Sequence, residues 1–333
     1  MTMTEPSISV VIPTYQRRDS AARLLTALAD QTVDPASYEV ILVVDGSTDG
    51  TREMADRFVA PYRLRVIGQS NRGRAAACNA GLRAAAGALV VVLDDDMEPG
   101  PEFLAAHQRA HAADDRLGVV GAVPVSLDDV PSPAAVYVGR KFNRHLAKLA
   151  QQQRFGLRDF YSGNFSVRRD LLLAVGGFDE DFQVYGNEDL ELSLRLAEYG
   201  VRLVFDPGAT ARQHYAKDFT ALARDTMAKG RTAVLLATKR PDTIPQLALS
   251  GYGRYGPAWR AVRGALLACT RRWPGTLGVA SRAIGWLEAR RPPRLDACYG
   301  LALDYFYWAG ALSALRENAA AGRRPASLAE LRR

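Results

Sequence analysis

Four apolar runs in the first 100 residues each lead into polar residues, and segments with a helical spacing of apolar residues separate the runs. The runs are residues 7–13, 38–44, 64–67 and 90–93, and the segments between them are 20–31, 51–58 and 75–82. Short continuous apolar runs are typical of buried strands. Strands that alternate with helices predict βαβ units, and therefore an α/β fold with a mostly parallel sheet flanked by helices.

The same pattern continues to about residue 205, and helices are expected after it. We predict helices over 101–113, 168–175 and 188–199, strands over 117–125, 159–167 and 201–205, and an irregular, mobile stretch over 126–160. Leucines at alternate positions from Leu190 to Leu196 would suit a strand, but the Leu, Glu, Ala and Arg content of 188–199 and the stop at Gly200 favour a helix. From residue 219 onward, prolines and glycines divide a helical region, and the tail after Gly322 is expected to be frayed.

Polar residues gather directly after three of the predicted strands. Thr14 and Tyr15 follow the first strand, Asp45 follows the second, and the triplet Asp94 to Asp96 follows the fourth. In an open parallel sheet, ligands bind at the carboxyl ends of the strands, which meet along one edge. We therefore expect these three clusters to converge in space.

The aspartate triplet Asp94, Asp95 and Asp96 is the strongest candidate for chemistry. Adjacent carboxylates repel one another, so a site that keeps them ionised favours a bound cation, and oxygen ligands favour a hard ion such as Mg²⁺ or Mn²⁺. In an extended chain, Asp94 and Asp96 would point one way and Asp95 the other. The alternative is a solvated loop in which Asp96 or Glu98 caps the next helix. The expected convergence with the other polar clusters favours a functional site.

The amino-acid composition is typical of a globular protein. The chain has 48% hydrophobic and 24% charged residues, which is ordinary for a globular protein. Its start lacks the layout of a secretory signal, and the nearly apolar segment 295–315 contains two aspartates, so we expect no membrane-spanning helix. Three widely separated cysteines suggest reduced thiols in a cytoplasmic protein.

The positive charge is concentrated in the last third of the chain. Residues 215–333 hold 20 Lys and Arg against 8 Asp and Glu, a net charge of +12, whereas residues 1–214 hold 23 against 28, a net charge of −5. Such a region suits an anionic membrane surface, a polyanionic acceptor or nucleic acid; the alternative is a solvated Arg-rich surface. The aromatic residues of 299–308 are expected in a helical core, with an acceptor wall or a membrane contact as alternatives.

Six short motifs over residues 7 to about 215 occur in the order found in the family 2 glycosyltransferases, which the chain resembles. They are Val11–Tyr15, Val43–Thr51, Asn71–Arg74 with Asn79–Gly81, Leu93–Asp96, Gly176–Asp179, and Glu188-Asp189 with His214. The resemblance implies a GT-A (Rossmann-like) fold, here with a C-terminal helical extension, and inverting transfer from a nucleotide sugar. The Gln-x-x-Arg-Trp motif of processive members does not occur, because Arg271-Arg272-Trp273 lacks the glutamine, so addition of a single sugar is expected.

The resemblance also implies which residues bind the donor. Asp45 would accept the N3–H of uracil or thymine, and Asp94 would hydrogen-bond the ribose, with Asp95 beside it. The strand-end residues Pro13, Thr14 and Tyr15 would border the base. An arginine, Arg74 or else Arg72, would reach the base or the diphosphate.

Metal and catalytic roles are implied in the same way. Asp96 is the first candidate ligand of Mn²⁺ or Mg²⁺, with Asp95 second, and His214 would complete the metal shell or contact the diphosphate. Asp189 would be the general base that deprotonates the acceptor, and a helix N-terminus there would favour its ionised form. Glu188 is the alternative base. Both acids also suit the first turn of a helix without any catalytic role.

The resemblance implies a metal-dependent, inverting, non-processive enzyme of the hexosyltransferase type that uses a UDP- or dTDP-sugar. Its acceptor would be a glycan, a lipid-linked glycan or a small molecule, and it would be cytoplasmic, with peripheral contact at the inner membrane face and no nucleic-acid partner. Residues 1–125 would bind the donor, 126–218 would bind the acceptor and carry the catalytic loop, and 219–333 would be helical. Two alternatives remain: a sugar-1-phosphate nucleotidyltransferase, although the loop after the first strand lacks glycine, and a non-catalytic nucleotide-sugar-binding protein.

Overall fold

The computed structural model describes residues 5–128, 132–152 and 155–322, which form two compact units. Unit 1 contains the described residues up to 128 together with those of 139–152, 155–183 and 188–215. Unit 2 contains the described residues 132–138, 184–187 and 216–322.

Unit 1 is built on a seven-stranded sheet with the strand order β3-β2-β1-β4-β7-β6-β8. Its strands are β1 (Ile8–Thr14), β2 (Tyr38–Asp45), β3 (Arg63–Gln69), β4 (Leu89–Leu93), β6 (Leu117–Gly121), β7 (Asn164–Arg168) and β8 (Arg202–Asp206). All neighbours pair in parallel except β7, which is antiparallel to both β4 and β6. The mostly parallel sheet predicted from the apolar runs is confirmed.

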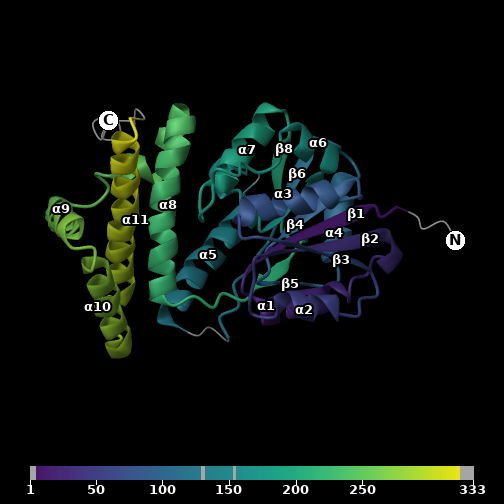
Figure 1. Ribbon diagram of the computed structural model, residues 1–333, viewed down its shortest axis with the longest axis horizontal. Coiled ribbons are helices and arrows are strands. Elements are labelled where there is room, and N and C mark those ends of the chain that lie inside the picture. The colour runs from purple at the N-terminus through teal and green to yellow at the C-terminus, as the bar shows by residue number, and fades with distance from the viewer. Residues whose placement is uncertain (1–4, 129–131, 153–154, 323–333) are drawn as a thin grey trace. The chain divides into compact units, whose positions relative to one another are not determined.

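Helices cover both faces of this sheet (Figure 1). One face packs against α1 (Arg18–Leu28), α2 (Thr51–Asp56) and α4 (Phe103–His111), and the other against α3 (Arg74–Ala84), α6 (Arg169–Ala174) and α7 (Glu188–Glu198). Side chains alternate along each strand, so Val10 and Ile12 of β1 enter the first core and Val11 enters the second. A sheet buried on both faces explains why its strands read as continuous apolar runs. The 3-10 turns η1 (Pro35–Ser37) and η2 (Leu157–Asp159) complete unit 1.

The irregular stretch predicted over 126–160 is wrong for most of its length. The helix α5 spans Pro133–Gln151, and residues 129–131 and 153–154 of the stretch lie outside the described residues. Phe142, Leu146 and Leu149 follow helical spacing in α5, and the two leucines are buried. Runs of Arg, Lys, His and Gln between these positions form the polar face of the helix and hide the apolar stripe in the sequence.

A second, two-stranded sheet was not predicted. It pairs β5 (Met97–Pro99) with β9 (Ala211–Gln213), antiparallel, with Met97 opposite Gln213. The chain turns at Asp95 and Asp96 before entering β5, so the triplet is not extended. The pairing brings the segment after the triplet beside the segment that leads to His214.

Unit 2 is helical, as predicted. It contains α8 (Phe219–Lys239), α9 (Pro257–Arg272), α10 (Thr276–Arg290) and α11 (Leu295–Ala320), with 3-10 turns η3 (Pro241–Gln246) and η4 (Ala248–Gly251) after α8. Helices α8 and α11 lie side by side (Figure 1), and glycine permits their close contact. A Cβ at Gly230 would lie 2.0 Å from the carbonyl oxygen of Tyr307, and one at Gly310 would lie 2.0 Å from that of Met227.

The aromatic residues of α11 form the core of unit 2. Tyr299, Tyr305, Phe306 and Trp308 are buried, as the core interpretation expected. None of the described helices has both the length and the hydrophobicity needed to cross a bilayer. The tail after Gly322, predicted to be frayed, lies outside the described residues.

Candidate active site

The predicted polar clusters meet at one edge of the sheet in unit 1. Thr14 is the last residue of β1, Asp45 is the last residue of β2, and Asp94 directly follows β4. These three strands are adjacent and parallel in the sheet, so their carboxyl ends lie side by side. The topology therefore brings the three clusters together, as the βαβ pattern predicts.

Asp45 organises the loop that leads into α3. Its buried carboxylate accepts hydrogen bonds from the Gln69 amide (2.7 Å) and from the backbone N–H groups of Arg72 (2.9 Å) and Gly73 (2.8 Å). Only the last of these bonds goes to Oδ2, and a carboxylate oxygen can accept two. The structure thus gives Asp45 a loop-forming role and leaves acceptor capacity on Oδ2, and base recognition stays a prediction.

Arg74, the first residue of α3, connects the donor side of the site to the proposed base. Its Nε and Nη2 donate to Asp94 Oδ1 at 2.9 and 2.7 Å. Its Nη1 donates to the Ser162 hydroxyl at 2.9 Å and lies 3.9 Å from Asp189 Oδ1. The Ser162 hydroxyl in turn donates to Asp189 Oδ1. One arginine therefore joins Asp94, Ser162 and Asp189 into a continuous network.

Burial and neighbouring charges shift the pKa values of both Arg74 and Asp189 in this network. Burial alone would lower the pKa of Arg74, but Asp94 and the other nearby acidic groups raise it well above its ordinary value, so the side chain remains a cation. Burial raises the pKa of Asp189 above its ordinary 3.8, although Arg74 and the Ser162 hydrogen bond work against this shift. A carboxylate with a raised pKa is a stronger base than an exposed one. Asp189 lies in the first turn of α7, as predicted.

The aspartate triplet occupies three different environments. Asp94 pairs with Arg74, Asp95 accepts a hydrogen bond from the Thr14 hydroxyl (2.8 Å), and the Asp96 carboxylate lies 3.3 Å from Nε2 of Gln213. Burial raises the pKa of Asp95 to about 7, and the charges of Asp96 and Asp94 add to this effect. Negative charge in the triplet is thus only partly compensated by Arg74 and by Arg17.

His214 lies beside the triplet because β5 pairs with β9. Its backbone N–H donates to the carbonyl oxygen of Asp96 at 2.9 Å, and its ring Nε2 lies 2.5 Å from Glu98 Oε2. A metal-binding histidine usually hydrogen-bonds a carboxylate through its second ring nitrogen, and Glu98 is placed for this while Nδ1 remains for a metal. Among the described residues there is no ready group of three His, Cys, Asp or Glu side chains for a metal. Mg²⁺ commonly takes one or two carboxylates plus substrate phosphates, so Asp96 and His214 suit an ion held largely by a diphosphate.

The other predicted residues lie nearby in unit 1. Pro13 is buried within β1, Tyr15 is 50% exposed just beyond its end, and Glu188 is buried next to Asp189. Arg72, the alternative cation, pairs instead with Glu180 at 2.7 Å. Their roles in donor binding and catalysis stay predictions.

Two residues of the site were missed from the sequence. The sequence predicts Ser162 only as part of a strand, and the polar Ser-Gly-Asn segment is its only signal of a role in the site. Glu98 was considered only as a helix cap. Its pairing with His214, 116 residues away, depends on the small sheet and has no local signature.

Models of known families match most of unit 1. A model described as glycosyl transferase family 2 matches residues 9–176, and one described as the N-terminal domain of galactosyltransferase matches residues 144–218.

Two curated relatives show the extent of the similarity. The chain is 33% identical over 221 residues to validoxylamine A glucosyltransferase of Streptomyces hygroscopicus subsp. limoneus. The aligned region covers 59% of this chain and 49% of that protein. It is 30% identical over 301 residues to the pre-mycofactocin glycosyltransferase of Mycobacterium tuberculosis, covering 87% of this chain and 58% of that protein. The chain spans about half the length of the curated relatives it matches.

Solved structures share the fold at low identity. Mannosyltransferase PcManGT from Pyrobaculum calidifontis, solved with GDP-Man and Mn²⁺, aligns with a TM-score of 0.63 and 21% identity over 94% of this chain and 88% of that chain. S. aureus TarS 1-349, solved with UDP, aligns with a TM-score of 0.53 and 15% identity over 95% and 92%.

Proposed function

Because the chain belongs to glycosyltransferase family 2 and has the GT-A fold, we propose that this glycosyltransferase moves one sugar from a UDP- or dTDP-sugar to an acceptor hydroxyl with inversion. The observation that carries the proposal is the Arg74 network, which joins Asp94 on the donor side to Asp189. Family membership favours sugar transfer over the nucleotidyltransferase and the non-catalytic binder. The GDP-Man, UDP and UDP-GlcNAc bound in the solved structures that share the fold support a nucleotide-sugar donor, and Asp45 supports a uracil or thymine base.

The chain's own residues suit a direct displacement. Ser162 and Arg74 both contact Oδ1 of Asp189, so we assign the other carboxylate oxygen, Oδ2, to the acceptor. That oxygen would take the proton of the acceptor hydroxyl. As the hydroxyl oxygen bonds to the anomeric carbon, the bond from that carbon to the diphosphate breaks on the opposite face and the nucleoside diphosphate leaves. The attack geometry inverts the anomeric configuration.

Asp96 and His214 are the residues that would hold a divalent ion, with Glu98 orienting the histidine. Such an ion, Mn²⁺ or Mg²⁺, would stabilise negative charge on the departing diphosphate, so that no general acid is needed. The presence of Mn²⁺ in the PcManGT complex supports this assignment.

The acceptor would be a glycan, a lipid-linked glycan or a small molecule, bound by residues 126–218, with donor binding in 1–125. We place the enzyme in the cytoplasm, with peripheral contact at the inner face of the membrane through the basic region 215–333, whose net charge is +12. The missing processive motif favours addition of a single sugar.

Thermal-shift measurements with UDP-, dTDP- and GDP-sugars, each with and without Mn²⁺, test the donor and metal assignments. A UDP- or dTDP-sugar with Mn²⁺ should add about 2.7 kcal/mol of stability at roughly a hundred times its Kd. Asp96→Asn should abolish the Mn²⁺-dependent part, whereas Asp30→Asn, at an exposed position, should not. Equal shifts with and without Mn²⁺ would exclude the metal site, and a preference for GDP-sugars would exclude the proposed role of Asp45.

A further inference from the structure

In unit 2, helices α9 and α10 and the short segments that follow each of them carry an exposed surface that is both cationic and aromatic. Residues 257–294, all of which the structure describes, contain eight arginines and no lysine, with Glu288 as their one acidic residue. Of these charged residues, Arg263 is buried, Glu288 is partly buried and hydrogen-bonded to the Tyr299 hydroxyl (2.6 Å), and the other seven arginines are exposed. The exposed charge of this segment is therefore entirely positive.

Apolar side chains lie among these arginines. Trp273 and Trp286, the two exposed tryptophans of the described chain, are 72% and 55% exposed, and Val262 and Val279 are also exposed. On α10, Val279, Arg282, Trp286 and Arg290 recur at intervals of three or four residues and so share one face, opposite the buried Ile284. The Arg290 guanidinium lies 3.6 Å from the centroid of the Trp286 ring.

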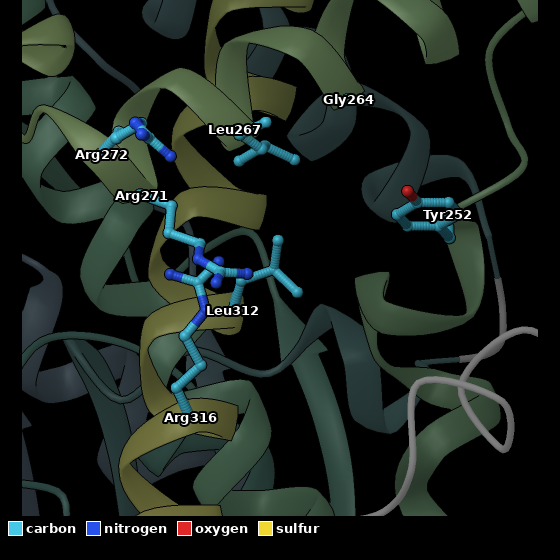
Figure 2. Close-up of a pocket in the computed structure, with 8 residues that line it drawn as sticks. Tyr252, Gly264, Leu267, Arg271, Arg272, Leu312 and Arg316 are labelled. Carbon is cyan, nitrogen blue, oxygen red and sulfur yellow. The ribbon is translucent and has the colours of Figure 1, made fainter.

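A pocket of about 470 Å³ lies between α9 and α11 beside this surface. Figure 2 shows Arg271 and Arg316 extending toward each other next to Leu312, with Leu267 above them and Tyr252 across the opening. Arg272 also lines the pocket, and Trp273 follows it directly in the chain. No acidic residue lines the pocket, and Arg271, Arg272 and Arg316 form no ion pair or hydrogen bond through their side chains within the described residues.

The wall of the pocket is fixed by buried contacts. Arg263 of α9 donates to Asp304 of α11 at 2.8 Å and to the carbonyl oxygen of Tyr252 at 2.8 Å. The indole N–H of Trp259 donates to the same aspartate, also at 2.8 Å. The three pocket arginines are therefore held near one another by packing that does not neutralise them. An anion between them would relieve their mutual repulsion, and guanidinium groups bind phosphate oxygens in pairs.

We propose that α9, α10 and the pocket form a docking surface for an anionic lipid bilayer, in which Arg271, Arg272 and Arg316 hold a phospholipid phosphate. Exposed tryptophans beside arginines suit the headgroup boundary, where the indole rings contact the acyl region and the guanidinium groups remain among phosphates. Nucleic acid would leave Val262 and Val279 without a role, so a bilayer fits the surface better. The proposal deepens the membrane contact given above, and it requires neither the donor nor the acceptor assignment.

Co-sedimentation of the full chain with vesicles tests the proposal. Vesicles of phosphatidylcholine containing phosphatidylglycerol should bind the protein, with a blue shift of tryptophan emission, and pure phosphatidylcholine vesicles should not. The triple variant Arg271→Gln, Arg272→Gln, Arg316→Gln should lose about a hundredfold in vesicle affinity. The matched control is Arg23→Gln, Arg57→Gln, Arg144→Gln, which removes the same charge from exposed positions of unit 1 and should change affinity by no more than about twofold.

A second variant tests the same surface without changing the arginines that line the pocket. Trp273→Ala with Trp286→Ala leaves every arginine in place and should also weaken vesicle binding and remove the emission shift. Equal binding to both kinds of vesicle, or equal losses in the two arginine triples, would overturn the proposal. So would stabilisation by inorganic phosphate without vesicle binding, which would indicate a free-anion site, or binding of RNA without vesicle binding. Donor binding in the arginine triple should be unchanged, so failure here is distinguishable from failure of the proposed transferase.

Discussion

At the scale of single residues, Arg74 determines the organisation of the site. It is a cation at all relevant pH values, it compensates Asp94, and with Ser162 it fixes one oxygen of Asp189. The sequence identified Asp94, Arg74 and Asp189 as separate candidates through short motifs. It could not show that they touch, because the Arg74–Ser162 and Ser162–Asp189 contacts join residues 88 and 27 positions apart.

Gly163 is required for this arrangement, and its replacement is the first test at the residue scale. A Cβ at Gly163 would lie 2.4 Å from Asp94 Oδ2, so Gly163→Ala must displace the Asp94 side chain or the turn that carries Gly163, just before β7. We expect at least a tenfold weaker donor affinity, about 1.4 kcal/mol, measured by calorimetry. Thermal unfolding of the unliganded variant would show whether the fold is kept.

The control for this prediction is Gly100→Ala. A Cβ at Gly100 would meet no atom within 4 Å, and the residue does not have a positive φ. This variant should bind the donor as the unaltered chain does. Normal donor affinity in Gly163→Ala would show that the position of Asp94 does not matter for binding.

At the scale of elements, two histidines of α4 connect that helix to β7. His107 contacts the Ser166 hydroxyl (2.7 Å) and the Asn164 amide oxygen (2.9 Å), and His111 contacts the same hydroxyl at 2.9 Å. Burial lowers the pKa of both histidines from 6.5 to about 4. Both are therefore neutral in the folded protein at neutral pH, and their role is structural.

This network predicts how stability depends on pH. The pKa of His107 is lower in the folded protein than in the unfolded chain. The contribution of the neutral His107 side chain to folding stability is therefore complete above pH 6.5 and is lost as pH falls toward 4. Between pH 7 and pH 5, the free energy of unfolding should fall by about 2 kcal/mol per such histidine. Urea unfolding at both pH values should show a smaller fall in His107→Gln. The comparison variant is His145→Gln, because His145 is only partly buried, lies 3.2 Å from Asp159 and is not part of this network. An equal fall in all three proteins would contradict the assignment.

Helices and strands could be predicted where the local sequence pattern alone is enough to specify them. The strands β1, β2 and β4 are buried on both faces, so their apolar runs are plain in the sequence, and α7 was identified by composition and by Gly200. Helix α5 was missed because its apolar stripe is interrupted by basic residues and its neighbouring prolines resemble loop composition. β5 and β9 have three residues each, and their pairing depends on tertiary structure rather than on local pattern.

At the scale of the whole molecule, charge and chemistry are divided between the two units. The acidic site belongs to unit 1, whereas the exposed arginines of 257–294 belong to unit 2. The sequence predicted this asymmetry from charge counts alone. It could not locate the arginine-lined pocket, which forms only when α9 and α11 pack together. The acceptor is likewise not readable from local pattern, because no motif in 126–165 or in the helical region specifies it.

The role of Asp189 is tested most directly by comparing Asp189→Asn with Glu188→Gln for donor binding and for turnover. Asp189→Asn should keep the donor affinity and lose at least roughly a hundredfold in kcat, the low end for general acid–base catalysis. In the unaltered enzyme, kcat should fall at acid pH with a midpoint above 3.8, because burial raises the pKa of Asp189 and the base must be ionised to act. Glu188→Gln should retain most of the turnover. An unchanged kcat in Asp189→Asn, or a larger loss in Glu188→Gln, would contradict the assignment of Asp189 as the base.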